Sequence, residues 1–413
     1  MRDKILESQH LGLGLGLAAA AAAAATTTYL LLTSHATPTP PPPTTTTPRP
    51  ALDPRKTARS PKWTVLPALS APARDALPYP PDVLPGARDV ATAYGNLRVY
   101  EFGPEDAPER VLLLHGIGTP CLALGGVAAE FVERGWRVMT FADFFGRGYS
   151  DAPLDIPHDA RLYTTQLLLA LASSPLQGWT GNDAFHLLGY SLGGAVAAAF
   201  ASSHPHLVRS LTLVAPGGLV RSAAHVGWRS RLLYNSEWVP EVVRRWFVAR
   251  RIAPVDPKSG GDVPEKETVD DDDDDDEGET AAEWDELRLA GGRRIGEVVR
   301  WQMETHPGYV RSYMSTIRHA PIYDRGGEEW RVLGEALAAR RAGAAPGLRK
   351  GRVLFVLGER DDIVVPGETV WDAETVLGED AVEVVVLKGG HEVAITKGRE
   401  IVGAVVAAWE NGS

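Results

Sequence analysis

The chain has 413 residues, 44% of them hydrophobic, which is enough apolar material for one large domain or two ordinary ones. The formal net charge is −11, and the acidic run at residues 270–277 carries −8 of it, so the other residues sum to −3. This balance argues against a nucleic-acid partner. Because Cys121 is the only cysteine, an intrachain disulfide and a multi-cysteine metal cluster are both excluded.

The first 60 residues differ in composition from the rest. Residues 11–32 are uncharged and, at 22 residues, long enough to cross a hydrocarbon core of about 30 Å as a helix. Three interpretations stay open: a membrane anchor, a signal peptide cleaved at the small residues of 34–36, or an Ala-rich leader without structure. The Thr/Pro-rich stretch 37–50 cannot pack a core and is typical of an extended spacer.

The charges that flank the hydrophobic stretch predict its orientation. Arg2 and Lys4 precede it, whereas no Lys or Arg follows it until Arg49. Since cationic residues stay preferentially on the cytosolic side, the pattern favours a single-pass membrane protein with a cytosolic N-terminus. A secreted or soluble protein is the alternative.

From about residue 90, apolar runs alternate with helical patterns, which predicts an α/β fold with a mostly parallel sheet and helices on both faces. Six runs are almost continuously apolar, as strands buried on both faces should be. They are residues 110–116, 137–144, 184–191, 210–216, 352–360 and 382–390. Helical patterns occupy residues 121–135, 191–205 and 396–412.

A serine stands where one of these strands meets a helix. Residues 189–193 read GYSLG and fit the pattern G-x-S-x-G, in which small residues relieve crowding around a nucleophile in a strained turn. Alone the pattern is weak, because Gly is abundant in this chain. Its position between a strand and a helix favours a nucleophilic Ser191, and a simple helix N-cap is the alternative.

Three further motifs accompany this elbow in a fixed order. They are LLLHGIG at residues 112–118, DFFGRGYS at 143–150, and the pair GERDDIVVP at 358–366 and GGHEV at 389–393. Together with the elbow they resemble the α/β-hydrolase family over roughly residues 90–410, and within it the esterase-like and monoacylglycerol-lipase-like members with a serine nucleophile.

The resemblance implies a catalytic triad. Ser191 would be the nucleophile and His391 the base that takes its proton. Asp361, three residues after Gly358 at the end of a strand, would be the acid that orients the imidazole, with Asp362 as the alternative.

The resemblance also implies an oxyanion hole made of the backbone amides of Leu192 and Ile117. The histidine of the His-Gly loop, His115, is expected to brace the turn rather than to act as a base. The other histidines show no metal spacing, and neither a metal nor a cofactor is expected.

In this family the segment 217–345 would form a helical cap. Residues 238–251 have the periodicity of an amphipathic helix, and 298–321 form a second helical stretch. The basic and aromatic residues around the first of these suit a lipid headgroup boundary, or else the aromatics pack on the sheet and the arginines face water. The acidic insert at about 255–282 is expected to be disordered.

The expected organisation is therefore a core split by the cap. The segments are the anchor and spacer at 1–60, the first part of the core at 61–216, the cap at 217–345 and the second part of the core at 346–413. The expected activity is hydrolysis of carboxylic esters, preferably lipid or acylglycerol esters, with water as second substrate. Peptidases, thioesterases and carbon–carbon hydrolases share the same triad, and a catalytically inactive binding module is the alternative from another class.

Overall fold

The computed structural model of the chain describes residues 52–140, 143–225, 240–253, 287–324 and 327–410. The hydrophobic stretch, the Thr/Pro spacer and the acidic insert lie outside these residues. Within the described ranges, no helix is both long enough and apolar enough to cross a membrane.

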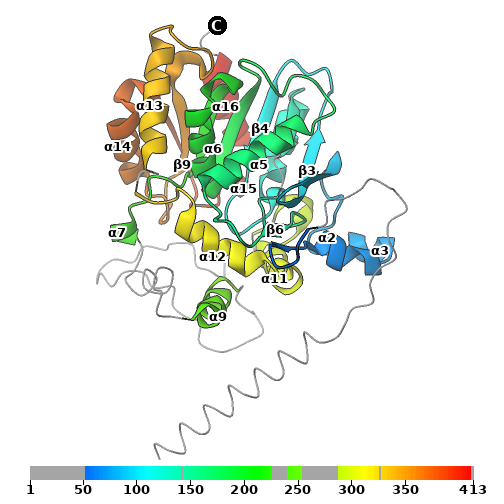
Figure 1. The fold of residues 1–413 in the computed structure, drawn as a ribbon. Helices are drawn as coiled ribbons and strands as arrows, with labels where there is room; N and C mark the ends of the chain where they lie inside the picture. Colours follow the sequence, from blue (N-terminus) through cyan, green and yellow to red (C-terminus); the bar gives the residue numbers. More distant parts are fainter. Residues whose placement is uncertain (1–51, 141–142, 226–239, 254–286, 325–326, 411–413) are drawn as a thin grey trace, which may run out of the picture. The chain divides into compact units, whose positions relative to one another are not determined.

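A central sheet of eight strands organises the fold, in the order β10-β9-β8-β7-β4-β5-β3-β2 (Figure 1). The strands are β2 (Ala87–Thr92), β3 (Gly95–Phe102), β4 (Arg110–Leu114), β5 (Arg137–Thr140), β7 (Phe185–Tyr190), β8 (Val208–Val214), β9 (Val353–Gly358) and β10 (Val382–Leu387). Strands β4, β5 and β7 to β10 pair in parallel, whereas β2 and β3 pair antiparallel at one edge. The six strands predicted from the apolar runs are confirmed: five lie within their runs, and β8 begins before its run, at Val208, and ends before the run does.

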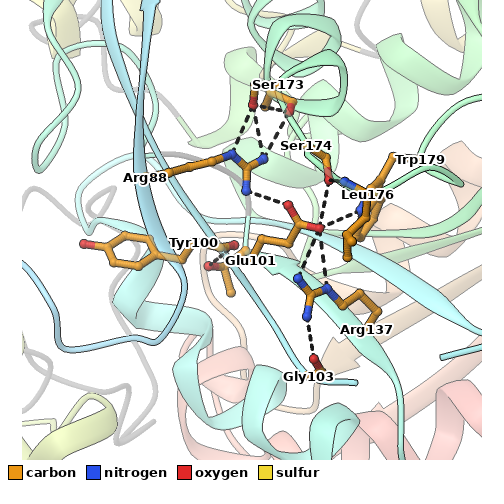
Figure 2. A network of polar contacts seen from close by, with 11 residues as sticks. Arg88, Tyr100, Glu101, Gly103, Arg137, Ser173, Ser174, Leu176 and Trp179 are labelled. Atoms are coloured by element: carbon orange, nitrogen blue, oxygen red, sulfur yellow. Dashed lines mark hydrogen bonds and ion pairs between the residues drawn. The ribbon is translucent and has the colours of Figure 1, made fainter. Parts of the chain in front are cut away.

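Strand β3 was not among the predicted strands because it carries charged residues, although nearly all of it is buried. Its Glu101 forms ion pairs with Arg88 of β2 and Arg137 of β5, and it accepts hydrogen bonds from the Ser174 hydroxyl and the Trp179 indole (Figure 2). Buried charge is tolerated in a strand when it is paired in this way.

Two groups of helices flank the sheet. One group comprises α4 (Gly125–Glu133), α15 (Val393–Thr396) and α16 (Gly398–Glu410). The other comprises α5 (Ala160–Ala172), α6 (Leu192–Ser203), α13 (Glu328–Arg341) and α14 (Pro366–Leu377). The Ala-rich helix α6 is almost completely buried, because its small side chains let it approach the sheet closely.

Beyond the sheet lie an N-terminal arm and the described part of the cap. The arm holds β1 (Thr57–Ala58), which pairs with β6 (Ala152–Pro153), and the short helices α2 (Pro61–Thr64) and α3 (Ala71–Asp75). Within the range predicted to form the cap, the helices that do not flank the sheet are α7 (Ser222–His225), α9 (Glu241–Ile252), α11 (Ile295–Thr305) and α12 (Tyr309–His319), and we call these four the cap helices. A second hydrophobic cluster joins the arm to α11 through Tyr79, Leu84, Ile295 and Trp301.

The cap helices differ from expectation in one respect and decide between two interpretations in another. The helical stretch predicted over 298–321 is two helices, because Pro307 disfavours helical geometry at the residue before it and ends α11 there. On α9, Val242, Val243, Trp246 and Phe247 are exposed, so the interpretation in which its aromatics pack on the sheet is wrong for Trp246 and Phe247, whereas Val248 is buried. Helix α13 lies within the range expected for the cap but packs on α6 and α14. The predicted domain boundaries stay predictions.

Candidate active site

Ser191 lies on a sharp turn between β7 and α6. Its backbone has φ 54° and ψ −120°, a conformation that non-glycine residues adopt only under strain. The two glycines of the elbow make the turn sterically feasible: a Cβ on Gly189 would lie 2.2 Å from the Gly193 carbonyl oxygen, and one on Gly193 would lie 2.3 Å from the Leu114 carbonyl oxygen. The Ser191 side chain makes no N-cap hydrogen bond to α6, so its hydroxyl remains available for another partner.

That partner is His391, which follows β10. The His391 Nε2 atom lies 3.0 Å from Ser191 Oγ, and its Nδ1 atom lies 2.9 Å from Asp361 Oδ2. The three predicted residues therefore form one hydrogen-bonded chain, although they come from loops that follow three different strands. Their roles in catalysis remain predictions.

Asp361, rather than Asp362, occupies the position beside the imidazole. Its other oxygen, Oδ1, accepts hydrogen bonds from the Ile363 amide at 3.0 Å and the Val364 amide at 2.7 Å, which fix the carboxylate. Asp361 is buried, whereas Asp362 is exposed. A buried, fully oriented carboxylate can stabilise an imidazolium more strongly than an exposed one.

Two opposing effects set the pKa of His391. Burial disfavours the charged imidazolium and lowers the pKa, while the Asp361 carboxylate favours it through charge and hydrogen bonding. Together with smaller contributions from the Asp362 and Glu392 carboxylates these favourable effects outweigh burial, so the pKa of His391 is raised above its ordinary value.

The two amides predicted to form an oxyanion hole flank the same serine. The Leu192 amide is at the first position of α6, where backbone N–H groups have no partner inside the helix. The Ile117 amide belongs to the loop after β4, which approaches the nucleophile closely: a Cβ on Gly116 would lie 3.6 Å from Ser191 Cβ. Neither amide donates a hydrogen bond to an acceptor among the described residues.

His115 braces this loop, as the sequence predicted. The Phe144 amide donates to His115 Nε2 at 3.0 Å, and the Nδ1–H group donates to the Gly116 carbonyl at 2.7 Å. Burial lowers the pKa of His115 to about 3, so the ring is neutral at physiological pH. Both ring nitrogens are occupied by the backbone, which leaves neither free to take a proton from a substrate.

The motif at 143–150 holds a second loop beside the first. The buried Asp143 accepts hydrogen bonds from the Tyr79 hydroxyl and from the amides of Cys121 and Tyr149. Burial raises the pKa of Asp143. A Cβ on Gly148 would lie 2.1 Å from the Asp143 carboxylate, so this position requires glycine.

Sequence reasoning did not single out three buried side chains that contact the oxyanion loop. Arg147 Nε donates to the Ile117 carbonyl at 2.6 Å, and both Tyr309 and Gln302 donate to the Gly118 carbonyl, at 2.8 and 3.2 Å. Arg147 is part of a recognised motif, which is the one signal that could have found it. The other two lie on cap helices α12 and α11, where no fixed spacing identifies them.

In the ranges that the structure describes, no group of three or more His, Cys, Asp or Glu side chains could hold a metal ion.

Comparison with known proteins agrees with this fold. A sequence profile of the α/β-hydrolase fold matches residues 109–255. Uncharacterised proteins of Mycobacterium tuberculosis are 30% identical over 156 residues, which is 38% of this chain and 42% of theirs. Lipase 1 of Psychrobacter immobilis is 29% identical over 131 residues, 32% of this chain and 39% of the lipase. The matches thus span less than half the length of these relatives.

Solved structures extend the likeness to most of the chain. A carboxylesterase of the thaumarchaeon Nitrososphaera gargenis superposes with a TM-score of 0.50 at 14% identity, covering 78% of this chain and 98% of the esterase. The 2-hydroxy-6-oxo-6-phenylhexa-2,4-dienoate hydrolase of a Rhodococcus species gives a TM-score of 0.50 at 18% identity, covering 78% and 97%. The profile match over residues 109–255 and these superpositions together show that the chain has the α/β-hydrolase fold.

Proposed function

We propose that the protein is a serine hydrolase that cleaves carboxylic esters through an acyl-enzyme. The observation that carries the proposal is the hydrogen-bonded chain from Ser191 Oγ through His391 to Asp361, with distances of 3.0 and 2.9 Å. A hydroxyl becomes an effective nucleophile when an adjacent base takes its proton, and this base must itself be oriented by a third group.

The first half-reaction would form the acyl-enzyme. As Ser191 Oγ attacks the ester carbonyl, His391 Nε2 takes the hydroxyl proton and the Asp361 carboxylate stabilises the resulting imidazolium without accepting that proton. The amides of Leu192 and Ile117 would donate to the developing oxyanion. His391 then returns the proton to the departing alcohol oxygen, and the C–O bond of the ester breaks.

The second half-reaction would reverse these roles with water. His391 takes a proton from water, the resulting hydroxide equivalent attacks the acyl carbon, and Ser191 leaves with the proton that His391 returns. The products are the carboxylic acid and free enzyme. Neither half-reaction requires a cofactor.

We further propose that the substrates are lipid or acylglycerol esters. The enzyme would act on them at a membrane to which residues 11–32 tether the chain. The exposed apolar residues of α9, together with Arg250 on the same helix, support a lipid-facing cap. Other hydrolases of this fold, including peptidases, thioesterases and carbon–carbon hydrolases, use the same triad chemistry, so the acyl class has to be measured.

A fluorophosphonate probe tests the proposal, because it reacts covalently with an activated serine. We expect the wild-type protein to be labelled and Ser191→Ala to remain unlabelled. Ser203→Ala provides a matched control, since this exposed serine at the end of α6 bonds only to its own helix and the adjacent His204. Absence of labelling in folded wild-type protein would favour an inactive binding module. A panel of short-chain and long-chain esters, amides and thioesters then assigns the acyl class.

A further inference from the structure

Three consecutive carbonyl groups of the oxyanion loop each accept a hydrogen bond from a buried side chain. The pairs are Gly116 with His115 Nδ1 at 2.7 Å, Ile117 with Arg147 Nε at 2.6 Å, and Gly118 with the Tyr309 hydroxyl at 2.8 Å and Gln302 Nε2 at 3.2 Å. Every peptide carbonyl from residue 116 to residue 118 is thereby held by a side chain: the first by His115 of the same loop, and the next two by side chains from outside it.

This arrangement determines where the loop's N–H groups point. In a planar trans peptide the carbonyl and the following N–H point in opposite directions, so holding one directs the other. The Gly116 carbonyl directs the Ile117 amide, and the next two carbonyls fix the peptides on its far side. Gly116 and Gly118 flank Ile117, and glycine has the greatest backbone freedom of any residue. His115 alone holds the peptide that carries the Ile117 N–H, and without the contacts from Arg147, Tyr309 and Gln302 the two peptides that follow it would keep this freedom.

Arg147 holds its position at an energetic cost. It is completely buried, and no described carboxylate lies within ion-pair distance of it. Its guanidinium is 5.3 Å from the ring centre of Tyr309 and donates to Ser312 Oγ at 2.5 Å, while Nη2 has no hydrogen-bond partner among the described residues. A buried charge without a counter-ion is expensive. Its hydrogen bond to the Ile117 carbonyl gives a functional reason to bury the guanidinium despite this unfavourable free energy.

The cap helices contribute directly to the same loop. Tyr309 begins α12, and Gln302 lies on α11 and also accepts from the Gly148 amide at 2.9 Å. Gln302 therefore bridges the oxyanion loop and the loop that carries Arg147. Because these contacts come from the cap, the geometry of the oxyanion loop depends on how the cap is seated.

We propose that Arg147, Tyr309 and Gln302 are positioning residues that hold the Ile117 amide in its oxyanion-binding direction. The cap is then part of the transition-state machinery and not only a cover for the substrate. The inference rests on the proposed serine-hydrolase function.

Tyr309→Phe is the most specific test, because it removes one hydroxyl and keeps the ring beside Arg147. Loss of one oxyanion donor typically costs about 10²- to 10³-fold in rate, and we expect this indirect loss to lower kcat about tenfold with KM nearly unchanged. Gln302→Leu should lower kcat to a smaller degree. The variant that carries both substitutions should lower kcat more than either substitution alone. Arg147→Lys extends the series if the protein folds.

A pair of substrates separates positioning from a general structural defect. In a thionoester, sulfur replaces the carbonyl oxygen and accepts hydrogen bonds poorly, so its hydrolysis depends little on the oxyanion amides. We expect Tyr309→Phe to slow the ester about tenfold and the thionoester by much less. Tyr163→Phe is the matched control, since its buried hydroxyl bonds to Thr316 of α12 at 2.6 Å and does not contact the loop. This control should leave the ratio of the two rates unchanged.

Two results would overturn the inference: equal slowing of the ester and the thionoester, or a change confined to KM. Failure of the proposed function looks different, because wild-type protein would then fail to react with the fluorophosphonate or Ser191→Ala would retain activity. A wild type that acts through Ser191, together with an unchanged rate ratio in Tyr309→Phe, would reject only the positioning role.

Discussion

Glu101 and Asp361 are both buried carboxylates, but their partners differ in kind. Glu101 is bound by two arginines, a serine hydroxyl and an indole N–H (Figure 2). Asp361 is bound by two backbone amides and one imidazole. Arginine keeps its proton at all ordinary pH values, whereas histidine gains and loses one near neutrality.

This difference separates a structural network from one capable of chemistry. Around Glu101 every partner is a fixed donor, and the pairs connect strands β2, β3 and β5 at the antiparallel edge of the sheet. Around Asp361 one partner, His391, can gain and lose a proton. Its imidazole is also hydrogen-bonded to the hydroxyl of Ser191, which is only partly buried. We therefore expect damage to the Glu101 network to reduce stability and damage to the Asp361 chain to reduce activity.

The largest effect should come from breaking the chain at its reactive end. We expect Ser191→Ala and His391→Ala each to lower kcat/KM on the order of 10⁴-fold or more, with the double variant no slower than either single one, because these groups act as a unit. Thermal unfolding should change little. Asp361→Asn should slow hydrolysis far more than Asp362→Asn. A double variant much slower than both single variants would contradict the pairing of Ser191 with His391.

Breaking the other network should reverse this pattern. Glu101→Gln keeps the side chain's size but leaves Arg88 and Arg137 without their shared counter-ion. We expect the free energy of unfolding to fall by about 3–5 kcal/mol, as for other buried pairs that lose one partner. Turnover at low temperature should stay near the wild-type value. Denaturant unfolding measures the first effect and steady-state kinetics the second.

Glu328→Gln is the matched control for that experiment, because it breaks an exposed ion pair with Arg331 on the surface of α13. Exposed pairs contribute little to stability. If Glu101→Gln and Glu328→Gln lowered the free energy of unfolding equally, the buried ion pairs of Glu101 would contribute no more to stability than an exposed pair does.

The sequence predicted the residues hydrogen-bonded around His391 better than it predicted the Glu101 network. The resemblance of four motifs to the α/β-hydrolase family pointed to Ser191, Asp361 and His391, and the structure joins these three side chains by hydrogen bonds, whereas their catalytic roles remain predictions. The Glu101 network stayed hidden, since charged residues made β3 look unlike a buried strand and its partners are distant in sequence. Tyr309 and Gln302 were missed for the same reason: their contacts with the oxyanion loop arise only when the cap is folded.

The smallest effect we predict concerns the pH dependence of the reaction. His391 can take the Ser191 proton only when neutral, so activity should fall as the pH drops through its pKa. Because Asp361 and its neighbouring carboxylates together outweigh burial and raise this pKa, the midpoint of the acid limb of kcat/KM should lie above the ordinary value of 6.5. Asp361→Asn leaves burial as the main effect and should move the midpoint to lower pH. Asp362 also raises the pKa, to a smaller degree, so Asp362→Asn should move the midpoint slightly in the same direction. Glu101→Gln changes only the structural network and should leave the pH midpoint unchanged. An unchanged midpoint in Asp361→Asn, or a shift in Glu101→Gln, would show that the two buried carboxylates do not divide stability and chemistry between them.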